Sequence, residues 1–218
     1  MASTAMSRGA RALEQSVGRE AVIRAAARVF MERGFTATTM DDIADVMGAT
    51  KGRVYHYYRS KVALFADVHE LALLMITTRI RQVFEAELPP DEKFHAMCKE
   101  HIRTMIEEFA LCRVGSVHGL DRHLIESAST QEARMLRKIV KMRDEFEGMF
   151  LQVIIDGIRS GHFREAPPKY AVKAALGALN WFGVWFDPTK KTSEAELATM
   201  SETLATFSTD GLRSLSSR

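Results

Sequence analysis

Residues 50 to 61 carry a concentration of side chains that suit contact with nucleic acid. Hydroxyl, ammonium, guanidinium and imidazole groups lie within a few helical turns of one another. Such groups bind phosphate oxygens and the edges of bases. The candidate side chains in this stretch are Thr50, Lys51, Arg53, Tyr55, His56, Tyr57 and Lys61. Lys61 follows Ser60 at an expected helix start, where the positive end of the helix also favours a phosphate.

Two short helices joined by a glycine turn are expected to position these groups. Thr39 precedes an apolar run and Asp42 stands three residues later, so the hydroxyl and the carboxylate can satisfy free N–H groups at a helix start. Gly48 tolerates the left-handed conformation that ends a helix. A second helix then begins near Thr50. This arrangement is suited to presenting one helix to a DNA groove.

The packing residues of this unit also follow from spacing. Val54 and Tyr58 lie four residues apart, on one face of the second helix, and are expected to point inward. Residues 19 to 33 place apolar side chains at helical spacing, and Gly34 ends that helix. The first 65 residues therefore form a compact three-helix unit that leads into a fourth helix.

Composition alone leaves a second interpretation open, in which the two helices are a small hairpin with a solvated polar face. Helix-turn-helix geometry is common among helical proteins. The net charge of +2 does not separate the two interpretations, and residues 1 to 60 hold only a modest excess of basic side chains. Any DNA binding must therefore come from local placement and from doubling by symmetry.

The stretch from about Arg19 to Phe65 resembles the DNA-binding domain of the tetracycline-repressor (TetR) family of bacterial transcription regulators. The matched positions, at fixed spacing, are Phe30, Gly34, Phe35, Thr38, Thr39, Ile43, Ala44, Gly48, Tyr55, Tyr58 and Lys61. The DNA contacts that the resemblance implies, mostly to phosphates, are Thr39, Lys51, Arg53, Tyr55, His56, Tyr57 and Lys61. It further implies that Lys51 and Arg53 read bases.

One position departs from the family pattern. Asp41 stands where some members carry a basic residue that contacts a base. A carboxylate can accept a hydrogen bond from cytosine N4, but it repels phosphate. We therefore expect Asp41 to interact with the helix dipole rather than to read bases.

The whole sequence predicts an all-α chain of about nine helices. Apolar periodicity predicts further helices over residues 61–86, 91–112, 130–160, 168–187 and 193–215. In the 130–160 helix, closed by Gly161, the residues expected to face inward are Ala133, Leu136, Val140, Phe146, Phe150, Val153 and Ile154. The expected domains are a flexible arm (1–18), a helix-turn-helix domain (19–65) and a helical effector-binding and dimerisation domain (66–218).

Several classes of protein are not supported by the sequence. Cys98 and Cys112 imply neither a disulfide framework nor a closed zinc site. His95, Cys98 and His101 have three-residue spacing, but positions six apart lie about 120° apart around a helix axis, so we expect no metal site. No apolar run spans a bilayer and no signal peptide is evident, which favours the cytoplasm. We expect no cofactor and no catalytic site, because no catalytic motif stands out.

The last two predicted helices, 168–187 and 193–215, suit assembly into a homodimer. The first is apolar on nearly all sides and must be covered on both faces. The second carries an apolar stripe formed by Leu197, Met200, Leu204, Phe207 and Leu215. The two helices can pack on each other, or form a two-fold four-helix interface with a second copy, which the family resemblance favours. Such a dimer places two recognition helices roughly 34 Å apart, over a near-palindromic DNA site.

The middle helices are expected to enclose a small apolar effector. Methionine and aromatic side chains suit a cavity that adapts to such a ligand, although similar stripes also form ordinary core. The candidate ligand contacts are Met97, His101, Met105, Phe109, Phe146, Phe150, Asn180, Trp181 and Trp185. The orientation of a further polar cluster stays open, namely His118, Asp121, Arg122 and His123.

A weaker similarity in the C-terminal half is to family members that sense acyl-coenzyme A or lipid-like acids. The residues that carry it are Gly161, His162, Phe163, Trp181, Trp185, Phe186 and Pro188. The expected effector is an acyl-coenzyme A or fatty-acid-like molecule, or an aromatic one. The expected function is a repressor that this effector releases from operator DNA. The alternative is a helical small-molecule or partner-binding protein that does not read DNA.

Overall fold

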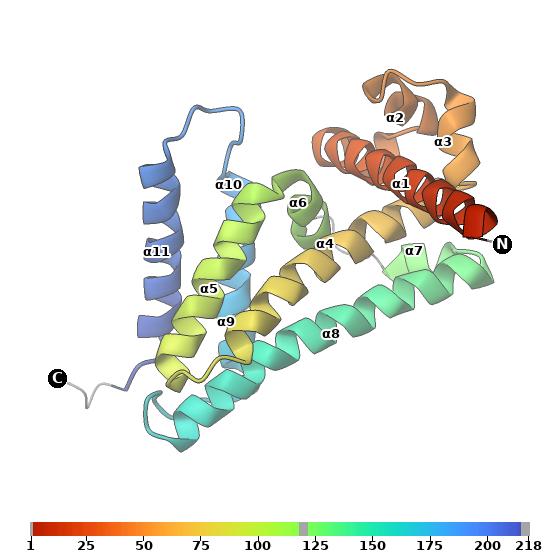
Figure 1. The fold of residues 1–218 in the computed structure, drawn as a ribbon. Coiled ribbons are helices and arrows are strands. Elements are labelled where there is room, and N and C mark those ends of the chain that lie inside the picture. Colours follow the sequence, from red (N-terminus) through yellow and green to blue (C-terminus); the bar gives the residue numbers. More distant parts are fainter. Residues whose placement is uncertain (1, 118–121, 215–218) are drawn as a thin grey trace.

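The computed structural model describes residues 2–117 and 122–214, with side chains described over residues 15–116 and 124–214. Within these ranges the chain is all-helical, as predicted (Figure 1). The helices are α1 (Ala2–Ala37), α2 (Met40–Val46), α3 (Lys51–Tyr57), α4 (Lys61–Phe84), α5 (Pro90–Glu107), α6 (Phe109–Val117), α7 (Arg122–Ser127), α8 (Thr130–Arg159), α9 (Pro168–Asn180), α10 (Phe182–Trp185) and α11 (Glu194–Asp210).

The N-terminal unit consists of α1, α2, α3 and the first turns of α4. In Figure 1, α1 lies across α2 and α3 at the end of the molecule opposite α11. Its core holds the fully buried side chains of Phe30, Ile43, Val54 and Leu64. Leu111 and Val114 of α6 join the same core. The unit is therefore continuous with the rest of the molecule through both α4 and α6.

The local signals that separate α2 from α3 are confirmed. Thr39 caps α2, and its hydroxyl and the Asp42 carboxylate form a reciprocal capping box. Gly34 and Gly48 both have positive φ, at 76° and 58°, which favours glycine because it lacks a Cβ. Thr50 is the N-cap of α3, although its side chain makes no capping hydrogen bond.

The C-terminal part is built on two long helices. Figure 1 shows α4 and α8 running diagonally through the molecule, with α5, α9, α10 and α11 gathered at one end. The core between them includes Phe94, Met97, Phe150 and Leu179, each fully buried. Gly161, at φ 78°, ends the α8 segment as predicted. These helices leave a cavity beside α5, described below.

Two predicted helices are each broken in the structure. The 91–112 helix divides into α5 and α6 at Glu108, where φ is −118° and ψ is 40°. The Glu108 carboxylate accepts a 2.7 Å hydrogen bond from Arg24 of α1, a partner too far away in sequence to be inferred from periodicity. The 168–187 helix divides into α9 and α10 at Trp181.

One inward residue of α8 was predicted incorrectly. Val140 is 37% exposed, whereas its neighbour Ile139 is buried against Ala66 and Leu136. The face of this 30-residue helix turns gradually around its axis, because 3.6 residues per turn do not keep a seven-residue register. The other predicted inward residues of α8 are all buried.

The final helix packs mainly on α5 rather than on α9. The apolar stripe of α11 is divided as a result. Leu197, Met200 and Leu204 pack against the C-terminal core, whereas Phe207 is 74% exposed. Leu215 lies outside the described residues.

Some predicted features fall at the edges of the described chain. Helix α1 begins at Ala2, so the segment expected to form a flexible arm continues the first helix. That segment is rich in helix-favouring residues, and extending a helix costs less than nucleating one.

His118 and Asp121 lie outside the described residues, as do the side chains of Arg122 and His123. In the described part of the chain, none of the helices combines the length and the apolarity needed to cross a bilayer.

Candidate nucleic-acid interface and cavity

Helix α3 exposes most of the side chains that the sequence assigns to DNA contact. Val54 is fully buried and Tyr58, just after the helix, is 3% exposed, so these two hold α3 to the core as predicted. Tyr55 is 42% exposed. The other exposed candidates are Thr39, Thr50, Lys51, Arg53 and His56. The exposed face of α3 is therefore polar and carries two strong cations.

Lys51 has a partner in the adjacent helix. Its Nζ donates a 2.8 Å hydrogen bond to the Asp41 carboxylate, and this contact raises the pKa of Lys51. Both side chains are more than half exposed, so water and salt screen the pair. Asp41 lies in the first turn of α2, as a helix-dipole partner should. Its contact with Lys51 was not foreseen from the sequence.

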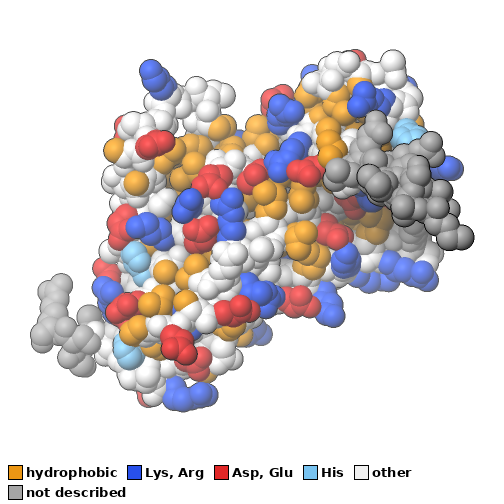
Figure 2. Space-filling view, viewed as in Figure 1, with side chains coloured by type: hydrophobic (Ala, Val, Ile, Leu, Met, Phe, Trp, Pro, Cys, Tyr) orange, Lys and Arg blue, Asp and Glu red, His pale blue; other side chains and the backbone are white. Residues whose placement is uncertain are grey.

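Arg53 is the cation of α3 that lacks an ion-pair partner among the residues that the structure describes. Its guanidinium offers several fixed donors, which is the geometry that pairs with guanine O6 and N7. Figure 2 shows Lys, Arg, Asp and Glu side chains interspersed over one face of the molecule. Attraction to DNA must therefore be local to α3 and its neighbours.

Tyr57 is half-buried against α1 instead of standing free. A Cβ placed on Gly18 would lie 2.0 Å from the Tyr57 hydroxyl oxygen, so the ring occupies space that only glycine leaves open. The His56 ring stands edge-on to Tyr57, with centroids 4.9 Å apart. Tyr57 therefore fixes the position of α3, and only part of its surface is available to a ligand.

Lys61 is bound by the protein itself. Its Nζ donates to the carbonyl oxygens of Phe35, Thr36 and Thr38 at 2.7, 3.2 and 2.7 Å. It also lies 4.5 Å from the centroid of the Phe35 ring. All three ammonium protons are therefore used to close the corner between α1 and α2. These contacts give Lys61 a structural role, and its phosphate contact stays a prediction.

A partly buried network that the sequence analysis missed fixes the end of α3. The Tyr58 hydroxyl donates a 2.6 Å hydrogen bond to Asp67 of α4 and accepts a 2.9 Å hydrogen bond from Arg19 of α1. Arg19 and Asp67 also form an ion pair. Burial raises the pKa of Tyr58 well above its ordinary value. The tyrosine is recognisable as an inward residue from spacing, but its two charged partners are not.

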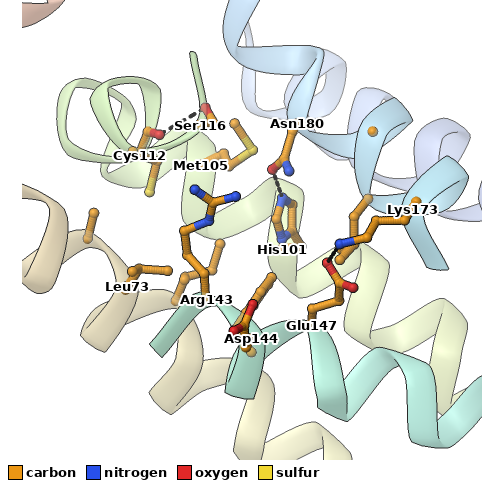
Figure 3. A pocket seen from close by; sticks show the side chains of 16 residues that line it. Leu73, His101, Met105, Cys112, Ser116, Arg143, Asp144, Glu147, Lys173 and Asn180 are labelled. Atoms are coloured by element: carbon orange, nitrogen blue, oxygen red, sulfur yellow. Dashed lines mark hydrogen bonds and ion pairs between the residues drawn. The ribbon is translucent and has the colours of Figure 1, made fainter. Parts of the chain in front are cut away.

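A cavity of about 300 Å³ lies between α4, α5, α6, α8 and α9 (Figure 3). Its wall combines apolar, polar and charged side chains from all five helices. The lining residues are Ala72, Leu73, Ile76, His101, Met105, Cys112, Gly115, Ser116, Arg143, Asp144, Phe146, Glu147, Lys173, Leu176, Gly177 and Asn180. This mixture suits a small amphipathic ligand better than a purely apolar one.

The predicted ligand contacts divide into three groups. Those that line the cavity are His101, Met105, Phe146 and Asn180. Those that are buried in the core without lining it are Met97, Phe109 and Phe150. Trp181 and Trp185 are 62% and 47% exposed, because the break at Trp181 turns both rings outward. The structure therefore does not bring the two tryptophans to the cavity.

His101 and Asn180 are partners of each other. The His101 Nε2 and the Asn180 Oδ1 lie 3.2 Å apart, joining α5 to the end of α9 across the cavity wall (Figure 3). Burial lowers the pKa of His101 to about 4, so the imidazole is neutral at ordinary pH. This pair accounts for the His101 Nε2 and the Asn180 Oδ1, whereas the buried His101 Nδ1 has no hydrogen-bond partner among the described residues.

The charged residues of the cavity wall were not among the predicted contacts. Arg143, Asp144 and Glu147 come from α8, and Lys173 comes from α9. Lys173 and Glu147 form an ion pair at 2.6 Å. A sequence signal did exist, because residues 143 and 147 flank Phe146 on the face of α8 that carries the apolar stripe.

Histidine and cysteine side chains of α5 serve different neighbours. His95 contacts Glu202 of α11 at 3.1 Å, Cys98 is buried in the core, and His101 bonds Asn180. Over the described residues, no three metal-ligating side chains gather at one point.

Two family models match successive parts of the chain. A family model described as bacterial regulatory proteins of the tetR family matches residues 22–68, and one described as the tetracyclin repressor-like C-terminal domain matches residues 87–207. The HTH-type transcriptional repressor KstR2 of Mycolicibacterium smegmatis is 24% identical over 179 residues, which cover 78% of this chain and 80% of that protein.

Two solved structures share the fold. The ketosteroid transcriptional regulator KstR2 of Mycobacterium tuberculosis aligns with a TM-score of 0.76 and 20% identity, covering 90% of this chain and 95% of that one. AibR in complex with isovaleryl coenzyme A and operator DNA aligns with a TM-score of 0.68 and 17% identity, covering 85% of this chain and 97% of that one.

Proposed function

We propose that this chain, which belongs to the TetR family of bacterial regulatory proteins and is a DNA-binding transcriptional regulator, represses transcription as a homodimer that a small effector releases from DNA. Regulators of this family are not enzymes. Family membership also sets aside the alternative of a helical carrier that does not read DNA. The site residues, the dimer and the effector class are the parts proposed here.

The exposed face of α3 is the observation that carries the DNA-binding part of the proposal. Val54 and Tyr58 hold the helix, and Arg53 extends from it without an ion-pair partner among the described residues. We assign base reading first to Arg53, and second to Lys51 after it leaves Asp41. The remaining contacts, which we assign to phosphates, are Thr39, Thr50, Tyr55 and His56, with the exposed part of Tyr57.

Exposed apolar side chains support the homodimer. Three helices at one end of the molecule carry large apolar residues that a soluble monomer would normally cover. The residues are Tyr170, Trp181, Val184, Trp185 and Phe207. A two-fold axis here would pair α9, α10 and α11 of one copy with the same three helices of the second copy. It would hold the two α3 helices roughly 34 Å apart.

The cavity supports a small effector with an apolar body. The relatives named above include a ketosteroid regulator and a structure containing isovaleryl coenzyme A. Together with the Met105 and Phe146 side chains in the cavity wall, they favour an acyl or otherwise lipid-like molecule over a sugar or a nucleotide base. An aromatic molecule of similar size remains within the proposal.

Helix α6 offers a route from the cavity to the DNA-binding unit. Cys112 and Ser116 line the cavity, whereas Leu111 and Val114 belong to the N-terminal core. A ligand that displaces α6 therefore moves residues packed against α1. Release requires that the ligand bind the displaced arrangement more tightly than the DNA-binding one, since equal affinity would shift nothing.

A gel-shift experiment tests the proposal. The full-length protein is titrated at low salt against the DNA upstream of its own gene, with an equal length of unrelated DNA as control. We expect a retarded complex with the upstream DNA at lower protein concentration than with the control. Equal retardation of both fragments would contradict a sequence-specific repressor acting at this site.

A further inference from the structure

The cavity contains an arginine without a carboxylate partner. Figure 3 shows Arg143 rising from α8 and directing its guanidinium into the cavity, toward the wall formed by α5 and α6. Among the residues that the structure describes, no acidic side chain lies within ion-pair distance of it. Arg143 is exposed and lines a half-open cavity, where an unpaired guanidinium can donate to an anion and its planar fork matches a carboxylate.

The other charged groups of the wall do not compete for the same role. Lys173 is paired with Glu147 at 2.6 Å, so its charge is already compensated. Asp144 also lines the cavity, next to Arg143 in sequence, and like Arg143 it is exposed to solvent. Its carboxylate would repel an anion. Among the charged positions of the described wall, Arg143 is therefore the one that stabilises a bound negative group most.

The deeper part of the wall suits an uncharged body. Met105, Phe146 and Leu176 are buried apolar residues of the cavity wall. His101 is held by Asn180, and burial keeps it neutral. The volume of about 300 Å³ lies at the lower end of the range for small-molecule sites. A compact acid fits within such a volume, whereas the coenzyme A part of a thioester would have to extend beyond it.

We propose that the cavity binds an apolar carboxylic acid, with its carboxylate on Arg143 and its body against Met105 and Phe146. This assignment of a carboxylic acid rests on the proposed function, since it takes the cavity to be the effector site. It deepens that function by naming an anionic head and the residue that recognises it.

Two dyes that differ by one charged group provide the test. Anilinonaphthalene sulfonate and N-phenylnaphthylamine share an apolar body, and only the first carries an anion. Both are titrated by fluorescence into the full-length protein without DNA. We expect Arg143→Gln to weaken binding of the sulfonate dye about tenfold, because a charge-assisted hydrogen bond is lost, and to leave the neutral dye within about twofold.

Two matched variants separate a local contact from general charge. Arg137→Gln makes the same change on an exposed part of α8 that does not line the cavity, and it should alter neither dye. Asp144→Asn removes the repelling carboxylate and should strengthen binding of the sulfonate dye. The proposal would be overturned if Arg143→Gln weakened binding of both dyes equally. It would also be overturned if Arg137→Gln weakened binding of the sulfonate dye as much as Arg143→Gln does.

Competition then identifies the head group. Decanoate, methyl decanoate and decanoyl coenzyme A are compared as displacers of the sulfonate dye. We expect decanoate to displace best from the wild type and to lose this advantage in Arg143→Gln. Displacement by the ester or by the coenzyme A thioester as strong as that by decanoate would overturn the carboxylate assignment.

Failure of this inference and failure of the repressor function are distinguishable. The dye measurements contain no DNA, and the gel shift contains no ligand. A protein that binds its upstream DNA but shows no dependence of dye binding on Arg143 would keep the repressor function and lose the acid site. A protein whose dye binding depends on Arg143, but which does not prefer its upstream DNA, would keep the acid site and lose the repressor function.

Discussion

Lys61 stabilises the corner between α1 and α2 through three backbone carbonyl oxygens. Replacing it with alanine leaves these acceptors without a partner in a partly buried site. We expect Lys61→Ala to lower the free energy of unfolding by about 1 to 3 kcal/mol. Arg59→Ala, at an exposed position two residues earlier, is the matched control and should change it by less than about 0.5 kcal/mol.

Chemical denaturation followed by circular dichroism measures this difference. A Lys61→Ala protein as stable as the wild type, but with weaker DNA binding, would restore the phosphate contact that the sequence predicts. Loss of stability together with DNA binding agrees with a structural lysine.

His101 makes the stability of the protein depend on pH. Burial lowers the pKa of His101 to about 4, whereas a histidine in an unfolded chain titrates at about 6.5. As the pH falls, the unfolded chain takes up this proton first, so stability decreases between those two values, by on the order of 3 kcal/mol from this residue.

Urea denaturation at pH 7 and at pH 5 measures this dependence. His101→Gln removes the titrating group, so we expect a smaller difference between the two pH values in that variant than in the wild type. An unchanged difference would show that other groups cause it. The carboxylates of the helix caps, including Asp42, have lowered pKa values and contribute at more acidic pH.

Residue types and spacing predict which side chains of the N-terminal unit point inward or outward, but not what they contact. Val54 and Tyr58 were recognisable because they lie four residues apart beside a capped helix start. The partners of Lys51, Lys61 and Tyr58 come from other helices, so no local pattern reports them. Arg143 lies three residues before Phe146 on α8, a spacing that the sequence shows, but only the tertiary fold shows that it turns toward α5.

At the level of elements, the break between α5 and α6 is the feature that links the cavity to the DNA-binding unit. Glu108 stands at the break and is bound by Arg24 of α1 at 2.7 Å. Arg24 also pairs with Glu20 at 2.8 Å within α1. The contact with Glu108 joins two helices that a ligand could move relative to each other.

Removing one partner at a time tests this link. We expect Glu108→Gln to weaken the communication between the two sites, so that more effector, by about threefold to tenfold, is needed to release DNA. Glu20→Gln removes the pair within α1 and leaves the contact of Arg24 with Glu108, so it should not change the effector requirement. The measurement is release of labelled upstream DNA by increasing decanoate or another acid that displaces the dye.

An equal effect of the two variants would contradict a specific role for the contact between α1 and Glu108.

Apolar periodicity predicts the helical character of α5 and α6, but it does not predict the break between them. The apolar spacing continues across Glu108, and the turn there is set by tertiary contacts of α6 with α1 and α4.

At the scale of the whole molecule, the proposed homodimer rests on the exposed apolar surface of α9, α10 and α11. Trp181 is 62% exposed, and truncating an interface tryptophan often removes much of the binding energy. We expect Trp181→Ala to raise the dimer dissociation constant at least about tenfold. Leu74→Ala, which truncates a 55% exposed residue on α4, is the control and should leave the dimer unchanged.

Sedimentation velocity over a range of concentrations measures the dimer directly. A wild-type protein that stays monomeric at micromolar concentration would contradict the proposed assembly.

The all-helical fold and the two-part organisation were predictable from capping, glycine positions and apolar periodicity. The packing of α11 on α5 was not, because both helices carry apolar stripes that suit several partners equally.

Fluorescence anisotropy with wild-type and Arg53→Ala proteins tests the central claim most directly, that α3 reads operator DNA. Labelled DNA from upstream of the gene is compared with random DNA of equal length at fixed salt. We predict that the wild type prefers the upstream DNA at least about a hundredfold, and that Arg53→Ala loses about tenfold or more of that preference while binding random DNA nearly as before. An Arg53→Ala protein with undiminished preference would contradict the account.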